Sequence, residues 1–228
     1  MKTKNENGIQ HIAILMDGNR RWAKKNGLQA IKGHEYVVNQ CIEPLIDRCI
    51  ELGIPYITLW AFSTENWNRS PLEVQTLLSL FRTAFKKNAA DLHKKGVRLN
   101  VIGDMSRFPA DIRTQTDEWI KLSHENTKIT ATFALNYGGR DEIIRAVNKL
   151  PKGDVTEEMI TESLDTAGMP DPEIIIRTGG EQRLSGFMLW QLEYSELFFS
   201  DVLMPDFTPA ELDKVIEEFH KRNRRFGR

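Results

Sequence analysis

The sequence contains little cysteine, and no stretch of it is a long apolar run. The two cysteines among its 228 residues, Cys41 and Cys49, are eight positions apart, which matches neither a zinc site nor a disulfide framework. We expect both to be core residues in a reducing compartment. No run approaches the roughly 20 apolar residues that cross a bilayer, and the polar start MKTKNENGIQ is not a signal peptide. We therefore expect a cytoplasmic protein, and peripheral contact with the inner face of a membrane stays open.

Neither sign of charge is in excess. The 31 Lys and Arg residues stand against 32 Asp and Glu residues, which gives a formal net charge of −1. A chain with this balance has no overall basic field to attract nucleic acid, so we expect no nucleic-acid partner. Any anion site must be built locally.

What the sequence does contain is an alternation of short β-rich apolar runs with longer helical patterns. The runs cover residues 11–16, 56–62, 97–103, 129–137 and 173–178, and the helical segments cover about 35–52, 70–95, 110–124, 140–150 and 209–226. This order predicts an α/β fold with a mainly parallel central sheet flanked by helices on both faces. No repeat or Ser/Gly linker interrupts it, so we expect a single domain over residues 1–228, with residues 1–9 flexible.

Polar residues follow each of the five expected strands. The clusters are Asp17-Gly18-Asn19, Ser63-Thr64-Glu65-Asn66, Gly103-Asp104, Asn136-Tyr137-Gly138-Gly139-Arg140 and Arg177-Thr178-Gly179-Gly180. Ligands bind outside the carboxyl ends of the strands in open α/β sheets, so all five clusters are expected at one rim. The alternative is that each is only a turn with a helix cap. Caps alone do not explain the four arginines found beside these turns, which are Arg20, Arg21, Arg177 and Arg183.

Arginine beside glycine-rich backbone is suited to diphosphate, because the guanidinium fork binds two phosphate oxygens and exposed N–H groups complete the cradle. The segments DGNRRW and RTGGEQRLS both have this character, so the rim could hold two phosphorylated ligands. Neither is a Walker loop or a GxGxxG fingerprint, which argues against a nucleotide site. Asp17 with Mg²⁺ would suit a diphosphate, since magnesium is usually held by one or two carboxylates and phosphate oxygens.

The best-marked helix begins at Ser70, with Pro71 at the first helical position and Glu73 placed to complete a capping box. It carries a wide apolar face that includes Val74, Leu77, Leu78, Phe81, Ala84 and Phe85. The pattern alone favours core packing, and the same face could also line a cavity for a greasy substrate.

Six stretches in chain order resemble one known family. They are HIAILMDGNRRWAKK, the Gly33-His34 pair, TLWAFSTENWNR, VRLNVIGD, NYGGRDEI and IIIRTGGEQRLSGFMLWQLEYSELFF. Together they resemble the cis-prenyltransferases, the undecaprenyl diphosphate synthase family, over about residues 10–227. The DDxxD motifs of trans-prenyl synthases are absent from the sequence.

The resemblance implies an enzyme that condenses isopentenyl diphosphate with an allylic diphosphate, usually farnesyl diphosphate. Its product would be a cis-polyprenyl diphosphate such as undecaprenyl diphosphate. The family is normally homodimeric and uses Mg²⁺, and its fold is a mainly parallel sheet between helices, which agrees with the pattern of strands and helices described above.

The resemblance also assigns roles to individual positions. Asp17 matches the aspartate that coordinates Mg²⁺ and assists loss of diphosphate, and Asn66 matches the residue at the place of the proton acceptor. Glu196 matches a second carboxylate at the metal, contributed near the dimer interface. The remaining positions are Gly18, Asn19, Arg20, Arg21, Trp22 and His34 for the allylic diphosphate, Ser63, Thr64, Glu65, Trp67 and Arg69 in a substrate-contacting loop, and Arg177, Arg183, Leu184 and Ser185 for the isopentenyl diphosphate. The Arg225-x-Gly227 ending resembles a tail motif that reaches substrate in the partner subunit.

Four positions depart from the usual bacterial pattern, and they bear on substrate preference more than on reaction type: Ala30, Val38, Gly186 and Glu193. Ala30 stands where an arginine is common, and Arg20 or Lys32 could compensate. Two other function classes stay open here. One is a non-catalytic partner subunit, and the other is a phosphate-binding hydrolase, for which the sequence offers no G-x-S-x-G elbow and no cluster of metal-ligating histidines.

Overall fold

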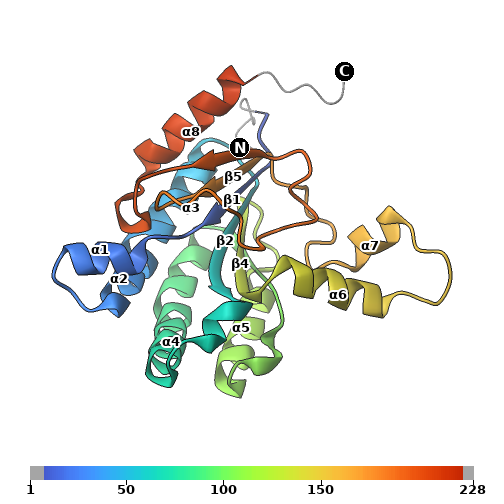
Figure 1. Ribbon diagram of the computed structural model, residues 1–228, viewed down its shortest axis with the longest axis horizontal. Helices are drawn as coiled ribbons and strands as arrows, with labels where there is room; N and C mark the ends of the chain where they lie inside the picture. The colour runs from blue at the N-terminus through green and yellow to red at the C-terminus, as the bar shows by residue number, and fades with distance from the viewer. Residues whose placement is uncertain (1–7, 223–228) are drawn as a thin grey trace.

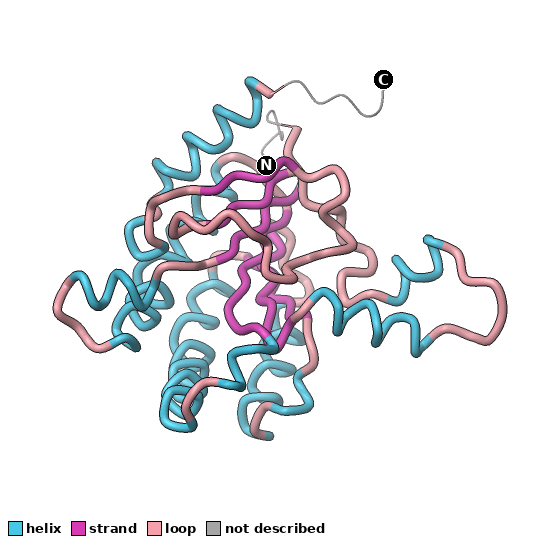
Figure 2. Tube along the Cα trace, in the orientation of Figure 1, coloured by secondary structure: helices cyan, strands magenta, loops and turns pink. Residues whose placement is uncertain are grey.

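The computed structural model describes residues 8–222, and its centre is a six-stranded sheet in which all paired strands are parallel (Figures 1 and 2). The strand order is β3-β4-β2-β1-β5-β6. The strands are β1 (His11–Leu15), β2 (Tyr56–Ser63), β3 (Val97–Ile102), β4 (Ile129–Tyr137), β5 (Ile174–Arg177) and β6 (Glu196–Phe199). The predicted α/β class with a parallel sheet is confirmed, and all five predicted strands are present.

Helices connect the strands and surround the sheet. They are α1 (Asn19–Lys25), α2 (Ala30–Tyr36), the π-helical segment η1 (Val37–Cys41), α3 (Ile42–Glu51), α4 (Pro71–Lys94), α5 (Ala110–Ser123), α6 (Gly139–Lys149), α7 (Glu157–Ser163) and α8 (Pro209–Lys221). Three short 3₁₀ segments are η2 (Thr64–Asn68), η3 (Met105–Arg107) and η4 (Met204–Asp206). Among residues 8–222, none of these helices combines the length and apolar character that crossing a membrane requires.

Strand β1 shows why the strands of the sheet appear in the sequence as continuous apolar runs. Ile12 and Ile14 pack with α3, α8 and the end of α4 on one face, while Ala13 and Leu15 pack against Phe187 and its neighbours on the other. Because both faces are covered, both sets of alternating side chains are apolar. The two cysteines belong to this core as expected: Cys41 and Cys49 are buried and free. Burial raises the pKa of the Cys41 thiol to about 11 and that of Cys49 to about 12.

Several local structures differ from the sequence expectation. Strand β6 and helices α1 and α7 are additional elements, each too short to show a period, with four to seven residues. The helix expected at 35–52 begins at residue 30 and contains η1. At the start of α4, Ser70 Oγ accepts from the Glu73 N–H at 3.3 Å as predicted, but Glu73 does not complete the capping box because its carboxylate binds Arg69 at 3.0 Å.

Part of the expected flexible segment 1–9 lies outside the described residues, and Ile9 is fully buried. The Arg225-x-Gly227 ending also lies outside them.

Candidate active site

All five polar clusters lie at the carboxyl edge of the sheet, as predicted, because all six strands point the same way. Three of them, after β1, β2 and β5, line one continuous set of cavities. The other two, after β3 and β4, support the site from behind. Asp104 Oδ1 accepts from the Ser106 N–H at 2.9 Å as an ordinary cap, and Asn136 Nδ2 donates to the Asp104 carbonyl oxygen at 2.7 Å. The turn-and-cap alternative therefore holds for the cluster after β3.

Asp17 is held rigidly at the end of β1. Its N–H donates to Thr178 Oγ1 at 2.9 Å, and the same hydroxyl lies 2.8 Å from the Asp17 carbonyl oxygen. Gly18 follows with φ of 99°, a left-handed backbone in which a Cβ would lie 2.8 Å from Leu203 Cδ2. Only glycine fits this turn without strain. The turn leaves the Asp17 side chain 38% exposed at the junction of the cavities.

Arg177, at the end of β5, connects Asp17 with a distant loop. Its side chain is only 6% exposed. Nη2 donates to Asp17 Oδ2 at 2.8 Å, while Nη1 donates to Ser185 Oγ at 2.9 Å and to the Arg183 carbonyl oxygen. Its buried Nε has no partner among the described residues. One planar guanidinium thus fixes Asp17 and the start of the loop at 183–185 relative to each other.

A cationic rim lies beside Asp17. Arg21 Nη2 is 3.6 Å from Asp17 Oδ1, and Arg20 Nη1 is 3.7 Å from Glu73 Oε1, the carboxylate that also binds Arg69. Arg20 and Arg21 are half-exposed, so their remaining donors face solvent and the cavity. These are the donors that diphosphate oxygens require.

Helices α1 and α2 meet backbone to backbone at the same rim. Gly33 makes this possible, because a Cβ there would lie 2.0 Å from the Asn19 carbonyl oxygen. Asn19 Nδ2 donates to the Met16 carbonyl oxygen at 3.0 Å and lies 3.4 Å from His34 Nδ1. Asn19 Oδ1 and His34 Nε2 are buried without a partner in the part of the chain that the structure describes. Buried polar atoms are normally hydrogen-bonded, so this pair points to a ligand.

The same surroundings set the charge of His34. Burial, and to a lesser extent the positive charges of Arg69 and Arg20, together lower the pKa of His34 to about 4. The imidazole is therefore neutral near pH 7 and adds no repulsion to the cationic rim.

The loop after β2 is braced by side chains. Asn66 Oδ1 accepts from the Ser63 N–H at 3.1 Å, within a reciprocal capping box. Trp67 Nε1 donates to Asn136 Oδ1 at 2.8 Å, and the guanidinium of Arg107 lies 4.7 Å from the centre of the Trp67 ring. Asn136 takes a left-handed backbone with φ of 46° at the end of β4. The loop is thus fixed in position before any ligand binds.

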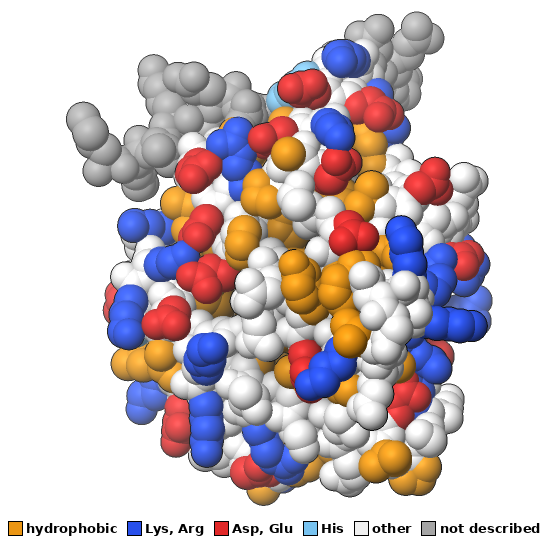
Figure 3. All heavy atoms as spheres, turned by 90° about the vertical axis from the view of Figure 1, so that its left-hand side faces the viewer, with side chains coloured by type: hydrophobic (Ala, Val, Ile, Leu, Met, Phe, Trp, Pro, Cys, Tyr) orange, Lys and Arg blue, Asp and Glu red, His pale blue; other side chains and the backbone are white. Residues whose placement is uncertain are grey.

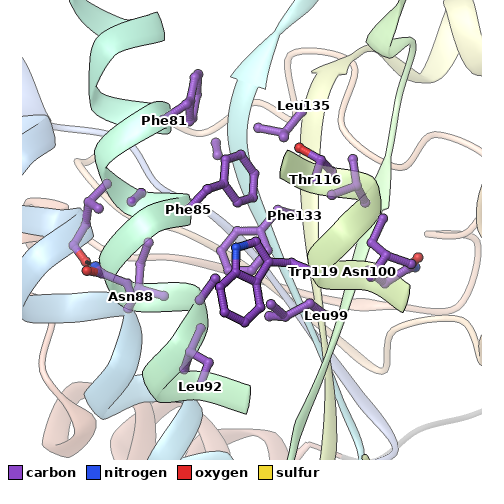
Figure 4. A pocket seen from close by; sticks show the side chains of 17 residues that line it. Phe81, Phe85, Asn88, Leu92, Leu99, Asn100, Thr116, Trp119, Phe133 and Leu135 are labelled. Atoms are coloured by element: carbon purple, nitrogen blue, oxygen red, sulfur yellow. Dashed lines mark hydrogen bonds between the residues drawn. The ribbon is translucent and has the colours of Figure 1, made fainter. Parts of the chain in front are cut away.

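Three adjoining cavities, which share lining residues from one to the next, occupy the rim and the space behind it. The outer one, of about 700 Å³, is lined by Asp17, Arg20, Arg21, Lys24, His34 and Arg69 among others. The middle one, of about 450 Å³, has a polar end at Asp17, Asn66, Arg177 and Ser185 and an apolar end at Leu77, Leu80 and Phe81. The inner one, of about 80 Å³, shares Val38, Ile42, Ala61 and Phe81 with the middle cavity. Figure 4 shows the rings of Phe85, Trp119 and Phe133 converging on the inner cavity.

The apolar face of α4 therefore serves both roles left open by its sequence. Leu77 and Phe81 belong to the core and also line the middle cavity. On the face of the molecule that carries α1 and α2, basic and acidic side chains are interspersed (Figure 3), so the positive charge at the rim is local, as the balanced composition implies.

Some of the expected site residues do not line the cavities. Trp22 Nε1 donates to Asp206 Oδ1 at 2.8 Å, Arg183 pairs with Glu181, and Leu184 packs in the core beside Trp60. Thr64 lies against Gly138 behind the loop after β2. These residues support the site from outside the cavities.

Glu196, which was predicted to be a second metal ligand, lies away from Asp17 within this chain. It begins β6 opposite Ile174, three residues before the pair Arg177–Phe199 at the rim, so it lies about 10 Å down the strand. Its carboxylate accepts from Arg222 Nη1 at 2.9 Å. Within one chain, Glu196 and Asp17 are not brought together. Residues 8–222 contain no group of three or more His, Cys, Asp or Glu side chains that could hold a metal ion.

Sequence reasoning gave no individual site role to three residues that organise the site: Glu73, Asn136 and Thr178. The role of Thr178 could have been found from its place directly after Arg177, because a hydroxyl at a strand end commonly braces a turn. No local signal identifies Glu73 as the partner of Arg20 and Arg69.

Comparison with known proteins agrees with this arrangement. The family model described as "Putative undecaprenyl diphosphate synthase" matches residues 15–227. The chain belongs to the undecaprenyl diphosphate synthase family. It is 46% identical to an isoprenyl transferase of Chromobacterium violaceum over 222 residues, which covers 96% of this chain and 88% of that protein. The chain is a prenyltransferase of this type, which excludes the phosphate-binding hydrolase alternative.

Two solved structures of this family have the same fold. The lavandulyl diphosphate synthase of Lavandula x intermedia, in complex with dimethylallyl diphosphate, superposes with a TM-score of 0.93 at 34% identity and covers 98% of this chain and 100% of that one. A "probable undecaprenyl diphosphate synthase" from Campylobacter jejuni gives a TM-score of 0.79 at 33% identity and covers 96% of this chain and 99% of that one.

Proposed function

We propose that this prenyltransferase condenses isopentenyl diphosphate with an allylic diphosphate, with farnesyl diphosphate as the preferred starter, to give a cis-polyprenyl diphosphate. The observation that carries the proposal is the joined pair of cavities: a cationic rim opens, past Asp17, into an apolar space between α4 and the sheet. A molecule with a charged diphosphate head and a greasy tail matches both ends.

The allylic diphosphate would bind at the outer cavity. Arg20, Arg21 and Arg69 supply donors there, and the unpartnered His34 Nε2 and Asn19 Oδ1 supply further polar contacts. Breaking the bond between C1 of the allylic chain and its diphosphate leaves negative charge on the departing group. Preorganised guanidinium groups stabilise that charge where it develops.

The residues present are suited to Mg²⁺ held together with substrate. Asp17 offers one partly exposed carboxylate, and magnesium is commonly bound by one or two carboxylates plus substrate phosphates and water. When bound, the ion would neutralise charge on the departing diphosphate. We propose that Glu196 joins this site only from a partner subunit in a homodimer, since within one chain it pairs with Arg222.

The isopentenyl diphosphate would bind beside Ser185, with Arg183 able to swing from Glu181 toward its phosphates. Its C4 forms the new bond to C1 of the allylic chain, and a proton leaves its C2 as the new double bond forms. Asn66 Oδ1 already accepts from the Ser63 N–H, and an amide is a weak base. We therefore assign Asn66 a positioning role and the proton to the departing diphosphate.

Loss of the arginine common at position 30 would be offset by Arg20, which lines the same cavity as Ala30. Lys32 is directed at Glu35, 2.6 Å away, and is less suited to this role. Arg20→Gly should raise KM for the allylic substrate, and an unchanged KM would remove Arg20 from this role.

The proposal further comprises one domain in the cytoplasm, with peripheral membrane contact for release of a greasy product.

A second candidate is synthesis of a single short diphosphate instead of a long chain. The backbone superposes better on the lavender enzyme than on the Campylobacter protein, with TM-scores of 0.93 and 0.79, and the inner cavity measures only about 80 Å³.

One experiment tests both candidates. Purified protein is incubated with Mg²⁺, radiolabelled isopentenyl diphosphate and either farnesyl or dimethylallyl diphosphate, and the dephosphorylated products are separated by chromatography. A ladder of cis-prenyl products, absent in Asp17→Ala, supports chain elongation, whereas one short product supports the second candidate. No labelled lipid with either starter would overturn the proposed function.

A further inference from the structure

The helical run from Ala30 to Glu51 is interrupted where it passes the cavities. Residues Val37–Cys41 form a π-helical turn, in which the Ile42 N–H donates to the carbonyl oxygen of Val37, five residues earlier. The cause lies in the sequence. Pro44 has no N–H, and its ring would meet the Gln40 carbonyl oxygen four residues earlier, so the preceding turn widens.

Because the turn is wide, the carbonyl oxygen of Val38 loses the hydrogen-bond donor that it would have in an α-helix. In an α-helix the Ile42 N–H would donate to the Val38 carbonyl oxygen, but here it is directed at Val37. The side chain of Asn88 donates instead: its Nδ2 lies 2.8 Å from the Val38 carbonyl oxygen. Asn88 belongs to α4, 50 residues further along the chain, and in Figure 4 its side chain points from α4 away from the converging rings. This contact joins α4 to the π-helical turn itself, while Lys95 at the end of α4 pairs with Glu43 and Asp47 of α3 further along.

The bond lies where the cavities join. Val38 lines both the middle and the inner cavity, and Asn88 lines the inner one. Phe81, one further residue common to both cavities, lies two helical turns before Asn88 on α4. Residues of α4 and of the π-helical turn therefore line the place where the two cavities adjoin, and the separation of these two segments sets the width of any passage from the site at Asp17 to the space around Trp119.

We propose that Asn88 is a product-length-determining residue of this enzyme. By donating to the Val38 carbonyl oxygen it holds α4 against the π-helical turn and keeps the passage narrow, which limits how far a growing prenyl chain can extend. Without this bond α4 separates from the turn, the passage widens and longer chains fit. This inference rests on the proposed function.

The test compares two replacements with a neighbouring control. Asn88→Asp keeps the shape and removes the donor, so that two oxygens face each other at Val38, and Asn88→Leu keeps the size and leaves the carbonyl oxygen unpaired. Lys87→Ala changes the adjacent exposed residue of α4. Product lengths are measured with labelled isopentenyl diphosphate, together with kcat/KM for the first condensation on farnesyl diphosphate.

We expect the longest product of both Asn88 variants to gain at least one isoprene unit. The first condensation should stay within about twofold of the wild-type rate, because Asn88 lines the inner cavity and not the cavities at Asp17. Lys87→Ala should leave the product lengths unchanged. Asn88→Gln, which retains an amide donor, should return the lengths toward those of the wild type, a recovery that a purely structural role would not give.

Unchanged or shortened products in both Asn88 variants, with the first condensation intact, would overturn the inference and leave the proposed function standing. If Asn88→Leu fails to fold, Asn88→Asp decides the matter, since it keeps the shape of the side chain while it replaces the donor with a charged acceptor. A wild-type protein that forms no labelled lipid would overturn the proposed function and, with it, this inference.

Discussion

Replacing Arg177 with lysine would test whether the site needs only the positive charge of this residue or also the forked shape of its guanidinium group. The Arg177 fork works in two directions: Nη2 donates to Asp17 at 2.8 Å, and Nη1 donates to Ser185 at 2.9 Å and to the Arg183 carbonyl oxygen. A lysine keeps the positive charge but has a single nitrogen, which cannot occupy both positions. One of the two arms must be lost.

The expected magnitude follows from the bond that is lost. A hydrogen bond to a charged group contributes about 1.5–3 kcal/mol. Since 1.36 kcal/mol corresponds to a tenfold change in rate, kcat/KM for the condensation should fall about 10- to 150-fold. KM for isopentenyl diphosphate should rise if the arm to Ser185 is lost, and kcat should fall if the arm to Asp17 is lost.

The assay is steady-state incorporation of labelled isopentenyl diphosphate, with each substrate varied in turn. Arg145→Lys is a matched control, because Arg145 is also a fork, with Nη1 and Nη2 at 2.7 Å and 2.6 Å from the two oxygens of Asp165, and it lines neither active-site cavity. Both variants should unfold at lower temperature, but only Arg177→Lys should lose activity. A value of kcat/KM within about threefold of the wild type, or an equal loss in the control, would refute the reasoning.

Three further predictions concern charge, pH and packing. Asp17→Asn should lower kcat at least about 100-fold in the same assay, because a neutral amide is a poorer ligand than a carboxylate for the Mg²⁺ that would neutralise the departing diphosphate; an unchanged kcat would exclude Asp17 from the chemistry. Burial lowers the pKa of His11 to about 4, so between about pH 6.5 and pH 4 the unfolded chain binds a proton that the folded chain does not, and the free energy of unfolding should decrease by about 2–3 kcal/mol as the pH falls through this range. His11→Asn should remove that part of the pH dependence in urea titrations, and an identical slope in the variant would contradict the assignment. Gly33→Ala should cost about 1–3 kcal/mol of stability and raise KM for the allylic substrate, because its Cβ would lie 2.0 Å from the Asn19 carbonyl oxygen; an unchanged melting temperature would show that α1 and α2 can separate freely.

Much of the fold could be predicted because its causes are local. The apolar run of β1, the cap at Ser70 and the proline at position 71 act within a few residues, and the corresponding strand and helix form where the sequence places them. The parallel order followed from the alternation of strands and helices. Strand β6, with only four residues, gave too short a pattern to be found.

The candidate site was predictable in its residue types but only partly in its geometry. The carboxyl-edge rule correctly placed Asp17 and Arg177 together, although they are 160 positions apart. It could not separate the clusters that line the cavities from those that brace them, such as Asn136 behind Trp67. It also could not show that Glu196 lies at the other end of its strand, since that depends on the register of β6 against β5.

The sequence by itself thus determined the elements, the parallel sheet and the chemistry available at its carboxyl edge, because hydrophobic period, caps and residue type are properties of the local chain. Only the tertiary structure decided which groups meet. The Arg177 fork, the Glu73 link between Arg20 and Arg69, and the bond from Asn88 to the Val38 carbonyl oxygen all join segments whose distance in space is set by packing against a common sheet. Their effect is non-local: the Val38 carbonyl oxygen, an acceptor left without its helical donor by the π-helical turn, is satisfied by an amide of another helix, and no pattern along the chain records that match.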